Sequence, residues 1–315
     1  MIEKIVLVTR KTRLEGLIER FNTRAQAKFY IEHSGGSFTF YEQEHSTYHT
    51  ALAQLRQGLH RILKVHVIER AFLPNYLFTE EDLVVTIGID GLVVNTAKYL
   101  TGQPLVAVNP DPAHIDGILL PFTVSSGLSI VPRVIREQVH CRDVTMAEAR
   151  LNDGQTLLAF NDLFIGVKSH VSARYRIQTN GLAEHHSSSG IIVSTGAGST
   201  GWLSSLFNMA SGMVRHTTRD SSGNRDSLLA PLKLPWDTDH LVFVVREPFV
   251  SKTSGAGIVM GEITRESPLI LESEMPEGGV IFSDGVEVDY LAFNAGSIAE
   301  IGVAAQKTRL VIGSA

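Results

Sequence analysis

Residues 82–100 read DLVVTIGIDGLVVNTAKYL, and the rest of the chain is organised around this stretch. The run from Leu83 to Ile87 is rich in β-branched residues and predicts a buried strand. It ends in Gly88-Ile89-Asp90-Gly91, after which apolar residues recur at helical spacing. The stretch therefore predicts a strand, a tight turn and a helix, an arrangement that presents backbone N–H groups to a phosphate.

An acidic residue, Asp90, is unexpected in a turn that could bind a phosphate. Asp90 would lie at the carboxyl end of a central strand, where open α/β sheets bind ligands. Its charge repels a phosphate unless a metal or a hydroxyl proton lies between them. Asp90 is therefore a candidate general base or magnesium-orienting carboxylate for phosphoryl transfer to a hydroxyl. The alternative is an aspartate that caps the helix and serves only its stability.

The composition excludes several classes of protein. A chain of 315 residues with 43% hydrophobic residues can bury a full core, and its length predicts two domains. The net charge of −5 gives no basic footprint for nucleic acid, and no apolar run is long enough to span a membrane. A single cysteine, Cys141, excludes intrachain disulfides, and the N-terminus resembles neither a secretory signal nor a transit peptide. We expect a cytoplasmic protein.

The first half alternates strand and helix patterns. Lys4–Thr9, Leu63–Ile68 and Pro104–Val108 are apolar runs typical of parallel strands, and helical patterns separate them. Together with the strand before Gly88, they predict a parallel, doubly wound α/β domain over residues 1–122.

Two groups of polar residues in this half are candidates for ligand binding. Arg10, Lys11 and Arg13 follow the first strand and would lie near the same strand-end crevice as Asp90, so Arg13 is a candidate phosphate ligand; a solvated loop is the alternative. His45 and His49 could bind a metal from one helix face, but the sequence shows no third ligand near them, and we predict no metal site there.

The second half, residues 123–315, contains many short alternating runs and few helical patterns. This pattern predicts an antiparallel β-sandwich-like domain, whose last residues could pack back on the first domain. Ser283-Asp284-Gly285-Val286 predicts a hairpin turn, because Asp-Gly tolerates the positive φ of a type I′ turn, and Asp284 is therefore assigned a structural role. Arg219–Asp226 is predicted to be a surface loop.

Two constellations in this half point to a nucleotide. Asn161 and Asp162 interrupt an otherwise apolar strand, and their amide and carboxylate groups suit an adenine or ribose edge; a turn at the strand end is the alternative. Ser194–Gly201, STGAGSTG, joins a buried strand to a helical pattern that begins at Trp202. Small residues in such a loop let the backbone approach a ligand, and hydroxyls and N–H groups can donate to its oxygen atoms; a plain turn is the alternative.

Taken in order along the chain, these motifs resemble the NAD kinase family, within the superfamily that also holds phosphofructokinases and diacylglycerol kinases. Gly88–Gly91 resembles its GGDG turn, Asn161-Asp162 its Asn-Glu/Asp pair, and Ser194–Trp202 its STPTGSTAY loop. The mitochondrial-type branch is the closer match. The segments that resemble this branch are Thr12-Arg13-Leu14-Glu15, Asn109-Pro110-Asp111-Pro112 with Gly117-Ile118-Leu119, Ser188-Ser189-Gly190 and Val245-Arg246-Glu247-Pro248.

The resemblance implies a Rossmann-like N-terminal domain, a β-rich C-terminal domain and a homodimer or homotetramer. It implies that Asp90 is the general base at the adenosine 2′-hydroxyl of NAD and that Gly88 lies at the phosphates. The residues that would bind NAD are Gly91, Asn161, Asp162, Ser189, Thr200, Gly201, Trp202 and Ser205. The phosphoryl donor would be ATP or inorganic polyphosphate, with Mg²⁺ as the divalent metal.

The sequence departs from the family at three positions. Ile89 stands where the family has its second glycine, and a branched side chain disfavours positive φ. Leu92 replaces the usual threonine, and Ser189 replaces an aspartate in most of the family. Ile89 and Leu92 motivate a second hypothesis, a nucleotide-binding protein with lost or altered phosphoryl transfer. A kinase of another hydroxylated substrate, such as a lipid or a sugar, is a third.

Overall fold

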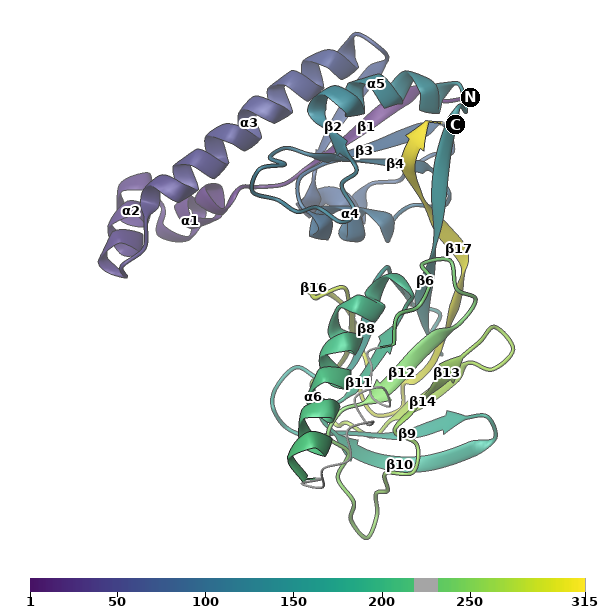
Figure 1. Ribbon diagram of the computed structural model, residues 1–315. Helices are drawn as coiled ribbons and strands as arrows, with labels where there is room; N and C mark the ends of the chain where they lie inside the picture. Colours follow the sequence, from purple (N-terminus) through teal and green to yellow (C-terminus); the bar gives the residue numbers. More distant parts are fainter. Residues whose placement is uncertain (218–231, 315) are drawn as a thin grey trace. The chain divides into compact units, whose positions relative to one another are not determined.

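The structure is a computed structural model that describes residues 1–217 and 232–314. These residues form a mixed α/β fold with two sheets (Figure 1). The chain divides into two compact units: Asp143–Lys307 is the second, and the first joins Met1–Arg142 to the chain from Thr308 onward. The predicted surface loop Arg219–Asp226 lies outside the described residues.

The first unit is built on parallel strands. Their order is β2-β1-β3-β4, and the end of β17 and the short β5 also pair with β4. β1, β3 and β4 are buried almost throughout, as expected of apolar runs covered on both faces, whereas β2 lies at the edge and is largely exposed. The strand bounds are β1 Lys4–Thr9, β2 Lys64–Glu69, β3 Asp82–Ile87, β4 Pro104–Asn109, β5 Phe122–Thr123 and β17 Ile298–Ser314.

Helices cover both faces of this sheet. α3 (Phe38–His60) and α5 (Val124–Ile135) share one hydrophobic core with the strands, and Figure 1 shows α4 (Asp90–Ala97) on the opposite face. The 3-10 helix η1 (Arg70–Asn75) contacts α4. α1 (Arg13–Phe21) and α2 (Arg24–His33) pack instead on the start of α3, around a small cluster of their own.

The boundary of the first unit differs from the sequence-based expectation. It lies after Arg142 and not after Phe122. The reason is α5, whose apolar face, Ile130, Val131 and Val134, is buried against α3 and the parallel strands. The change in sequence pattern after Phe122 therefore marks the end of the alternation of strands and helices but not the end of the unit.

The second unit consists mainly of antiparallel strands. One group has the order β10-β9-β14-β17 and the other β13-β12-β11-β8-β15-β16, and both contribute to one hydrophobic core. The bounds are β6 Val139–Leu151, β7 Thr156–Ala159, β8 Asp162–Val167, β9 Ala173–Thr179, β10 Leu182–Ser188, β11 Ile191–Ser194, β12 Leu241–Val245, β13 Met260–Ile263, β14 Leu269–Ser273, β15 Gly279–Ser283 and β16 Val286–Ala292.

Alternation along β8 and β11 assigns each side chain to a face. Ile165 and Ile191 point into the shared core, whereas Phe164 and Ile192 point to the other face. There they meet Trp202 and other residues of α6 (Trp202–Thr217), which Figure 1 shows running across β8 and β11. The helix that follows the predicted binding loop is thus fixed to the strand that carries Asp162.

The predicted hairpin turn is confirmed. Asp284 and Gly285 have φ values of 55° and 69° and join β15 to β16. Both central residues of a type I′ turn need positive φ, which is why Asp-Gly occupies it. Among the described residues, no helix has both the length and the hydropathy needed to cross a membrane.

Candidate functional site

The turn after β3 has the predicted form. Gly88 is buried, and its N–H donates to the carbonyl of Val108 on β4 at 3.1 Å. Ile89 occupies the N-cap position of α4, and the helix begins at Asp90. A buried strand, a short turn and a helix N-terminus therefore follow one another as the sequence predicts.

Ile89 does not strain this turn. Its φ is −113° and its ψ is 167°, which is extended backbone that any L-residue adopts. Because the φ of Ile89 is negative, the backbone at this position does not require glycine. The side chain of Ile89 is 40% exposed and lines a cavity of the first unit. The departure from the glycine of the family motif therefore changes the lining of a cavity and leaves the backbone relaxed.

Asp90 binds a distant segment of backbone. Its Oδ2 accepts the N–H of Ile118 at 3.2 Å, and its Oδ1 accepts the N–H of Leu119 at 3.1 Å. The alternative interpretation of Asp90 as a helix cap is wrong, because Ile89 holds that position without a side-chain cap. A carboxylate has about four acceptor positions, so each oxygen of Asp90 can accept a further hydrogen bond.

The segment that Asp90 holds is a loop ordered by Asn109. The Nδ2 of Asn109 donates to the carbonyl of Ile115 at 2.8 Å, and its Oδ1 accepts the N–H of Asp111 at 2.9 Å. Asn109 is buried at the end of β4. The segment with Asn109 at one end and Leu119 at the other is thus a closed loop whose far end is fixed to Asp90.

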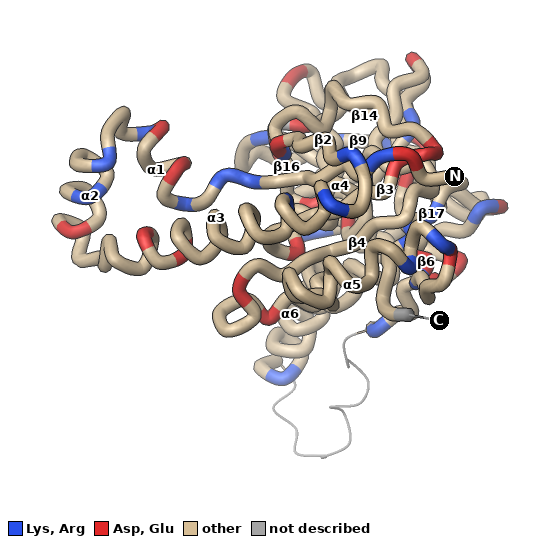
Figure 2. The backbone as a smooth tube through the Cα atoms, turned by 90° about the horizontal axis from the view of Figure 1, so that it is seen from above, with Lys and Arg blue, Asp and Glu red and all other residues tan. Residues whose placement is uncertain are grey.

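The cavity that Ile89 lines has a volume of about 360 Å³ and two arginines in its wall. Arg10 and Arg13 share one acid: Arg10 Nη2 lies 3.1 Å from Glu44 Oε1, and Arg13 Nε lies 2.6 Å from Glu44 Oε2. Asp111 also lines the cavity, so its wall holds two guanidiniums and two carboxylates. Figure 2 shows the basic residues where the chain passes from β1 to α1.

Arg10 lies directly over the turn. A Cβ at Gly88 would lie 3.3 Å from Arg10 Cδ and 3.0 Å from Leu92 Cδ2, so a side chain at Gly88 would displace its neighbours. The guanidinium of Arg10 stacks over the ring of Tyr48 at 5.2 Å, and its buried Nε has no hydrogen-bond partner in the described part of the chain. Arg13, the phosphate ligand predicted from the sequence, is the more exposed of the two arginines, whereas Arg10 and Glu44 were not predicted as site residues.

In the second unit, Asp284 fixes the backbone of the Asn161-Asp162 segment. Its carboxylate accepts the N–H groups of Phe160 at 3.0 Å, Asn161 at 2.7 Å and Asp162 at 3.2 Å. The hydroxyl of Thr195 donates to the carbonyl of Phe160 at 2.6 Å. Asp284 was predicted to serve only its own turn; the sequence gives no sign that it also orders this segment.

The side chains of Asn161 and Asp162 are left for other partners. Both residues are half-buried, and within the described residues neither side chain forms a hydrogen bond. Burial, with the neighbouring carboxylate of Asp284, raises the pKa of Asp162 to about 7. The backbone of Asn161 and Asp162 is fixed by hydrogen bonds, and their side-chain polar groups remain available. This is expected of residues that contact a ligand.

The loop from Ser194 to Gly201 uses its buried members for packing and exposes the rest. A Cβ at Gly198 would lie 2.0 Å from the carbonyl oxygen of Asn161, so only glycine fits there. The hydroxyl of Ser199 accepts the N–H of Leu234 at 3.1 Å. Thr200, Gly201 and Ser205 are exposed, and the N–H of Ser205 donates to the carbonyl of Gly201 at 3.2 Å.

Trp202 and Ser189 both contact Arg246. The indole of Trp202 stacks nearly parallel to Phe164, with ring centroids 5.9 Å apart, and the guanidinium of Arg246 lies 5.5 Å from the Trp202 ring. The N–H of Ser189 donates to the carbonyl of Arg246 at 2.9 Å. Arg246 belongs to the Val-Arg-Glu-Pro segment noted in the sequence but was not selected as a site residue.

The predicted residues therefore fall into two groups, one in each unit. Gly88, Asp90 and Gly91 form the turn of the first unit, with Arg13 in the wall of the neighbouring cavity. The predicted NAD ligands other than Gly91 belong to the second unit, where Asn161 and Asp162 contact the Ser194–Gly201 loop.

Comparison with known proteins finds similarity in structure alone. No protein-family model matches the chain, and no curated protein matches its sequence. Yeast NADH kinase in complex with NADH is similar over 100% of this chain and 84% of its own, with 14% identity and a TM-score of 0.57. An NAD kinase from Archaeoglobus fulgidus in complex with ATP is similar over 97% of this chain and 92% of its own, with 14% identity and a TM-score of 0.55. The chain shares the fold of these two kinases.

Proposed function

We propose that this protein is an NAD(H) kinase that transfers a phosphoryl group to the adenosine 2′-hydroxyl of its substrate. The observation that carries the proposal is Asp90, a carboxylate at the carboxyl end of a parallel strand and at a helix N-terminus, in a fold shared with an NADH kinase and an NAD kinase. Its oxygens are oriented by the N–H groups of Ile118 and Leu119 and retain acceptor positions.

In the proposed reaction, Asp90 accepts the proton of the 2′-hydroxyl as that oxygen attacks the terminal phosphorus in line, and the bond from this phosphorus to the rest of the donor breaks, which releases ADP or a shortened polyphosphate. Gly91 beside it leaves room for the ribose, because a Cβ there would meet no heavy atom within 4 Å. The guanidiniums of Arg10 and Arg13 in the cavity beside Ile89 would bind the phosphates of the donor, for which ATP is the first candidate and polyphosphate the second.

The predicted NAD ligands of the second unit are assigned as follows. Asn161 and Asp162 would bind the adenosine half, and the proposal assigns Ser189, Thr200, Gly201, Trp202 and Ser205 to the rest of the nucleotide. The free side chains of Asn161 and Asp162 support this assignment, as does the stacked indole of Trp202.

Mg²⁺ would accompany the donor. It binds oxygen ligands and is commonly held by one or two carboxylates together with substrate phosphates. The chemistry of Asp90 fits this role. Assembly into a homodimer or homotetramer, a cytoplasmic location and the absence of nucleic-acid and membrane partners remain predictions.

A nucleotide-binding protein without phosphoryl transfer is the second candidate. The exposed side chain of Ile89 in the cavity wall favours it, since that side chain takes space that a glycine would leave open. A kinase of a lipid or a sugar remains the third candidate.

One assay separates these candidates. Purified protein is incubated with NAD or NADH, Mg²⁺ and a panel of donors comprising ATP, other triphosphates and polyphosphate, and the NADP or NADPH formed is measured. Calorimetry with NAD and with ATP runs in parallel. Product formed with at least one donor supports the kinase. Binding of NAD with no product from any donor selects the second candidate, and neither binding nor product contradicts both.

A further inference from the structure

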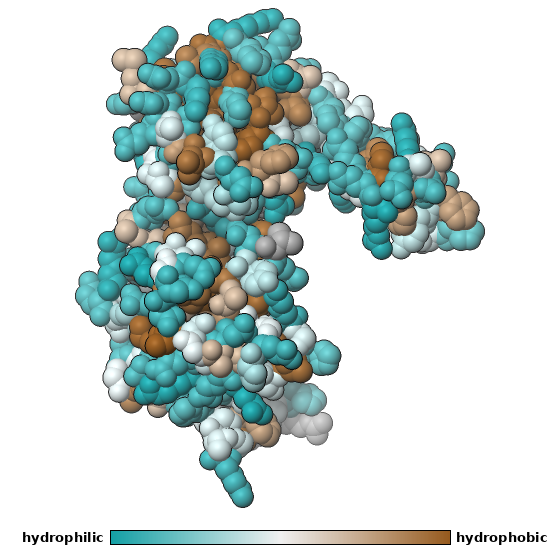
Figure 3. Space-filling view, turned by 180° about the vertical axis from the view of Figure 1, so that it is seen from behind, coloured by the Kyte–Doolittle hydropathy of each residue, from teal (hydrophilic) through white to brown (hydrophobic). Residues whose placement is uncertain are grey.

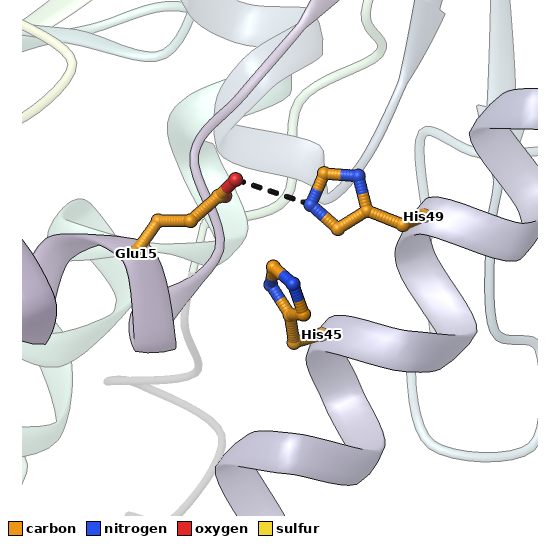
Figure 4. A group of neighbouring side chains, drawn as sticks. All are labelled: Glu15, His45 and His49. Carbon is orange, nitrogen blue, oxygen red and sulfur yellow. Dashed lines mark hydrogen bonds and ion pairs between the residues drawn. The ribbon is translucent and has the colours of Figure 1, made fainter. Parts of the chain in front are cut away.

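Three side chains of the first unit lie together outside the site described above. Glu15 comes from α1, and His45 and His49 come from α3 (Figure 4). One ligand atom of each lies within 4.8 Å of those of the other two. Within the part of the chain that the structure describes, this is the only group of His, Cys, Asp or Glu side chains spaced to hold a metal ion.

The helix geometry brings the two imidazoles together. His45 and His49 are one turn apart on α3, and their ring centroids are separated by 4.3 Å. Side chains four residues apart share one face of a helix, which is the spacing with which two histidines bind one zinc ion. The sequence shows this pair but not the third ligand, because Glu15 reaches it only through the packing of α1 on α3.

The two carboxylate oxygens of Glu15 have different hydrogen-bond partners. Oε2 closes the capping box of α1 by accepting the N–H of Thr12 at 2.6 Å, and the hydroxyl of Thr12 lies 3.0 Å from the same oxygen. Oε1 turns the other way and lies 3.1 Å from His49 Nε2. The cap therefore orients the carboxylate while leaving one oxygen directed at the histidines.

Thr12 also orients His45. Its hydroxyl lies 2.9 Å from His45 Nδ1. Because the hydroxyl has one hydrogen and donates it to Glu15 Oε2, the Nδ1–H of a neutral His45 donates to the hydroxyl oxygen. Nε2 then carries the lone pair that a metal needs. A bond from the second ring nitrogen to a fixed acceptor is the arrangement that supports metal-binding histidines.

We propose that Glu15, His45 and His49 form a binding site for Zn²⁺. Two imidazoles and one carboxylate suit zinc, whereas Mg²⁺ and Ca²⁺ prefer oxygen ligands alone. Three protein ligands leave a fourth position for water or an external ligand. A plain ion pair between Glu15 and His49 is the competing account, but it gives no role to the second imidazole.

The helices around the proposed site share only a small hydrophobic core, so a metal that joins them would add stability. α1, α2 and the start of α3 have only Leu14, Ala27 and Phe38 as fully buried core residues. Figure 3 shows mainly hydrophilic side chains over this part of the surface. A metal joining α1 to α3 would supply stability that so small a core does not, as in other metal-stapled domains. It would also fix Arg13, which begins α1.

Metal binding tests the proposal independently of kinase activity. The protein is freed of metal with a chelator and titrated with ZnCl₂ by calorimetry in the presence of a competing chelator, which suppresses weak binding to other histidines. We expect one Zn²⁺ per chain, a rise in the melting temperature and no comparable response to MgCl₂. Absence of stoichiometric Zn²⁺ binding would overturn the proposal.

Four variants locate the site. His45→Ala, His49→Ala and Glu15→Gln should each lower the affinity for Zn²⁺ by at least about 100-fold, since loss of an outer-shell partner alone costs about 10–100-fold. His60→Ala changes an exposed histidine at the end of the same helix and should bind as the wild type does. Glu15→Gln is the decisive variant if a histidine variant fails to fold, because glutamine can keep the capping box. Wild-type affinity in Glu15→Gln and in the folded histidine variants contradicts the assignment.

Discussion

Asp90 in the first unit and Asp162 in the second are the two carboxylates selected from the sequence, and the fold surrounds them differently. Asp90 itself accepts two N–H groups from a distant loop. The carboxylate of Asp162 accepts none from the residues that the structure describes, and a third aspartate, Asp284, accepts the N–H groups around it. In the first unit, the candidate site residue Asp90 itself holds the nearby backbone through its carboxylate. In the second unit, the carboxylate of Asp284 holds the backbone, and the carboxylate of the candidate site residue Asp162 does not. A carboxylate can therefore order a candidate site either as one of its members or from a neighbouring position.

The largest effect is expected from Asp90→Asn. An amide has one acceptor oxygen and cannot take a proton from the substrate, so NADP formation should fall by about 10²–10⁴-fold, the usual contribution of general-base catalysis. The measurement is kcat under saturating donor and NAD. Asp116→Asn, an exposed acid of the same loop, is the control and should retain wild-type kcat. Equal kcat in Asp90→Asn would remove Asp90 from the chemistry.

Asp284→Ala should have the next largest effect, on stability. It leaves three backbone N–H groups without their acceptor and puts alanine at a φ of 55°. Each buried N–H left unpaired costs about 1–3 kcal/mol, so we expect the free energy of unfolding to fall by about 3 kcal/mol or more. Urea unfolding measures it, with the exposed Glu277→Ala as control. A loss no larger than that of the control would show that Asp284 does not support the segment.

Asp162 should make stability depend on pH. Its pKa is about 7 in the folded chain and about 3.9 when unfolded, so the folded state holds the proton more tightly. The stabilisation is complete below about pH 4 and is lost as the pH rises through 7, amounting to about 3 kcal/mol between pH 5 and pH 8. Urea unfolding at the two pH values measures this difference. Asp162→Asn should remove most of it, and an unchanged difference would contradict the assignment.

Ile89→Gly should have the smallest effect. The backbone at Ile89 is already extended, so glycine relieves no strain and costs about 0.5–1 kcal/mol of stability through its greater freedom in the unfolded chain. Thermal unfolding measures the change. A variant more stable than the wild type would show that the turn is strained after all. A kinase assay on the same variant reports whether the side chain in the cavity wall limits donor use.

Much of the fold was predictable because the signals for it are local. Apolar runs set β1, β3 and β4, the Asp-Gly pair set the turn between β15 and β16, and the glycine turn before Asp90 set the start of α4. The end of the first unit was not predictable. Whether α5 belongs to one unit or the other depends on the core that receives its apolar face.

By itself, the sequence determined which polar residues stand out: Asp90 after a buried strand, Asn161 and Asp162 within another, and a histidine pair four residues apart. Only the tertiary structure decided what surrounds them. It brought Ile118 and Leu119 to Asp90, Asp284 to the Asn161 segment and Glu15 to the histidine pair. The physical reason is range: hydrophobic period and turn chemistry act over a few residues, whereas the partner of a polar group is chosen by packing between segments far apart in the chain.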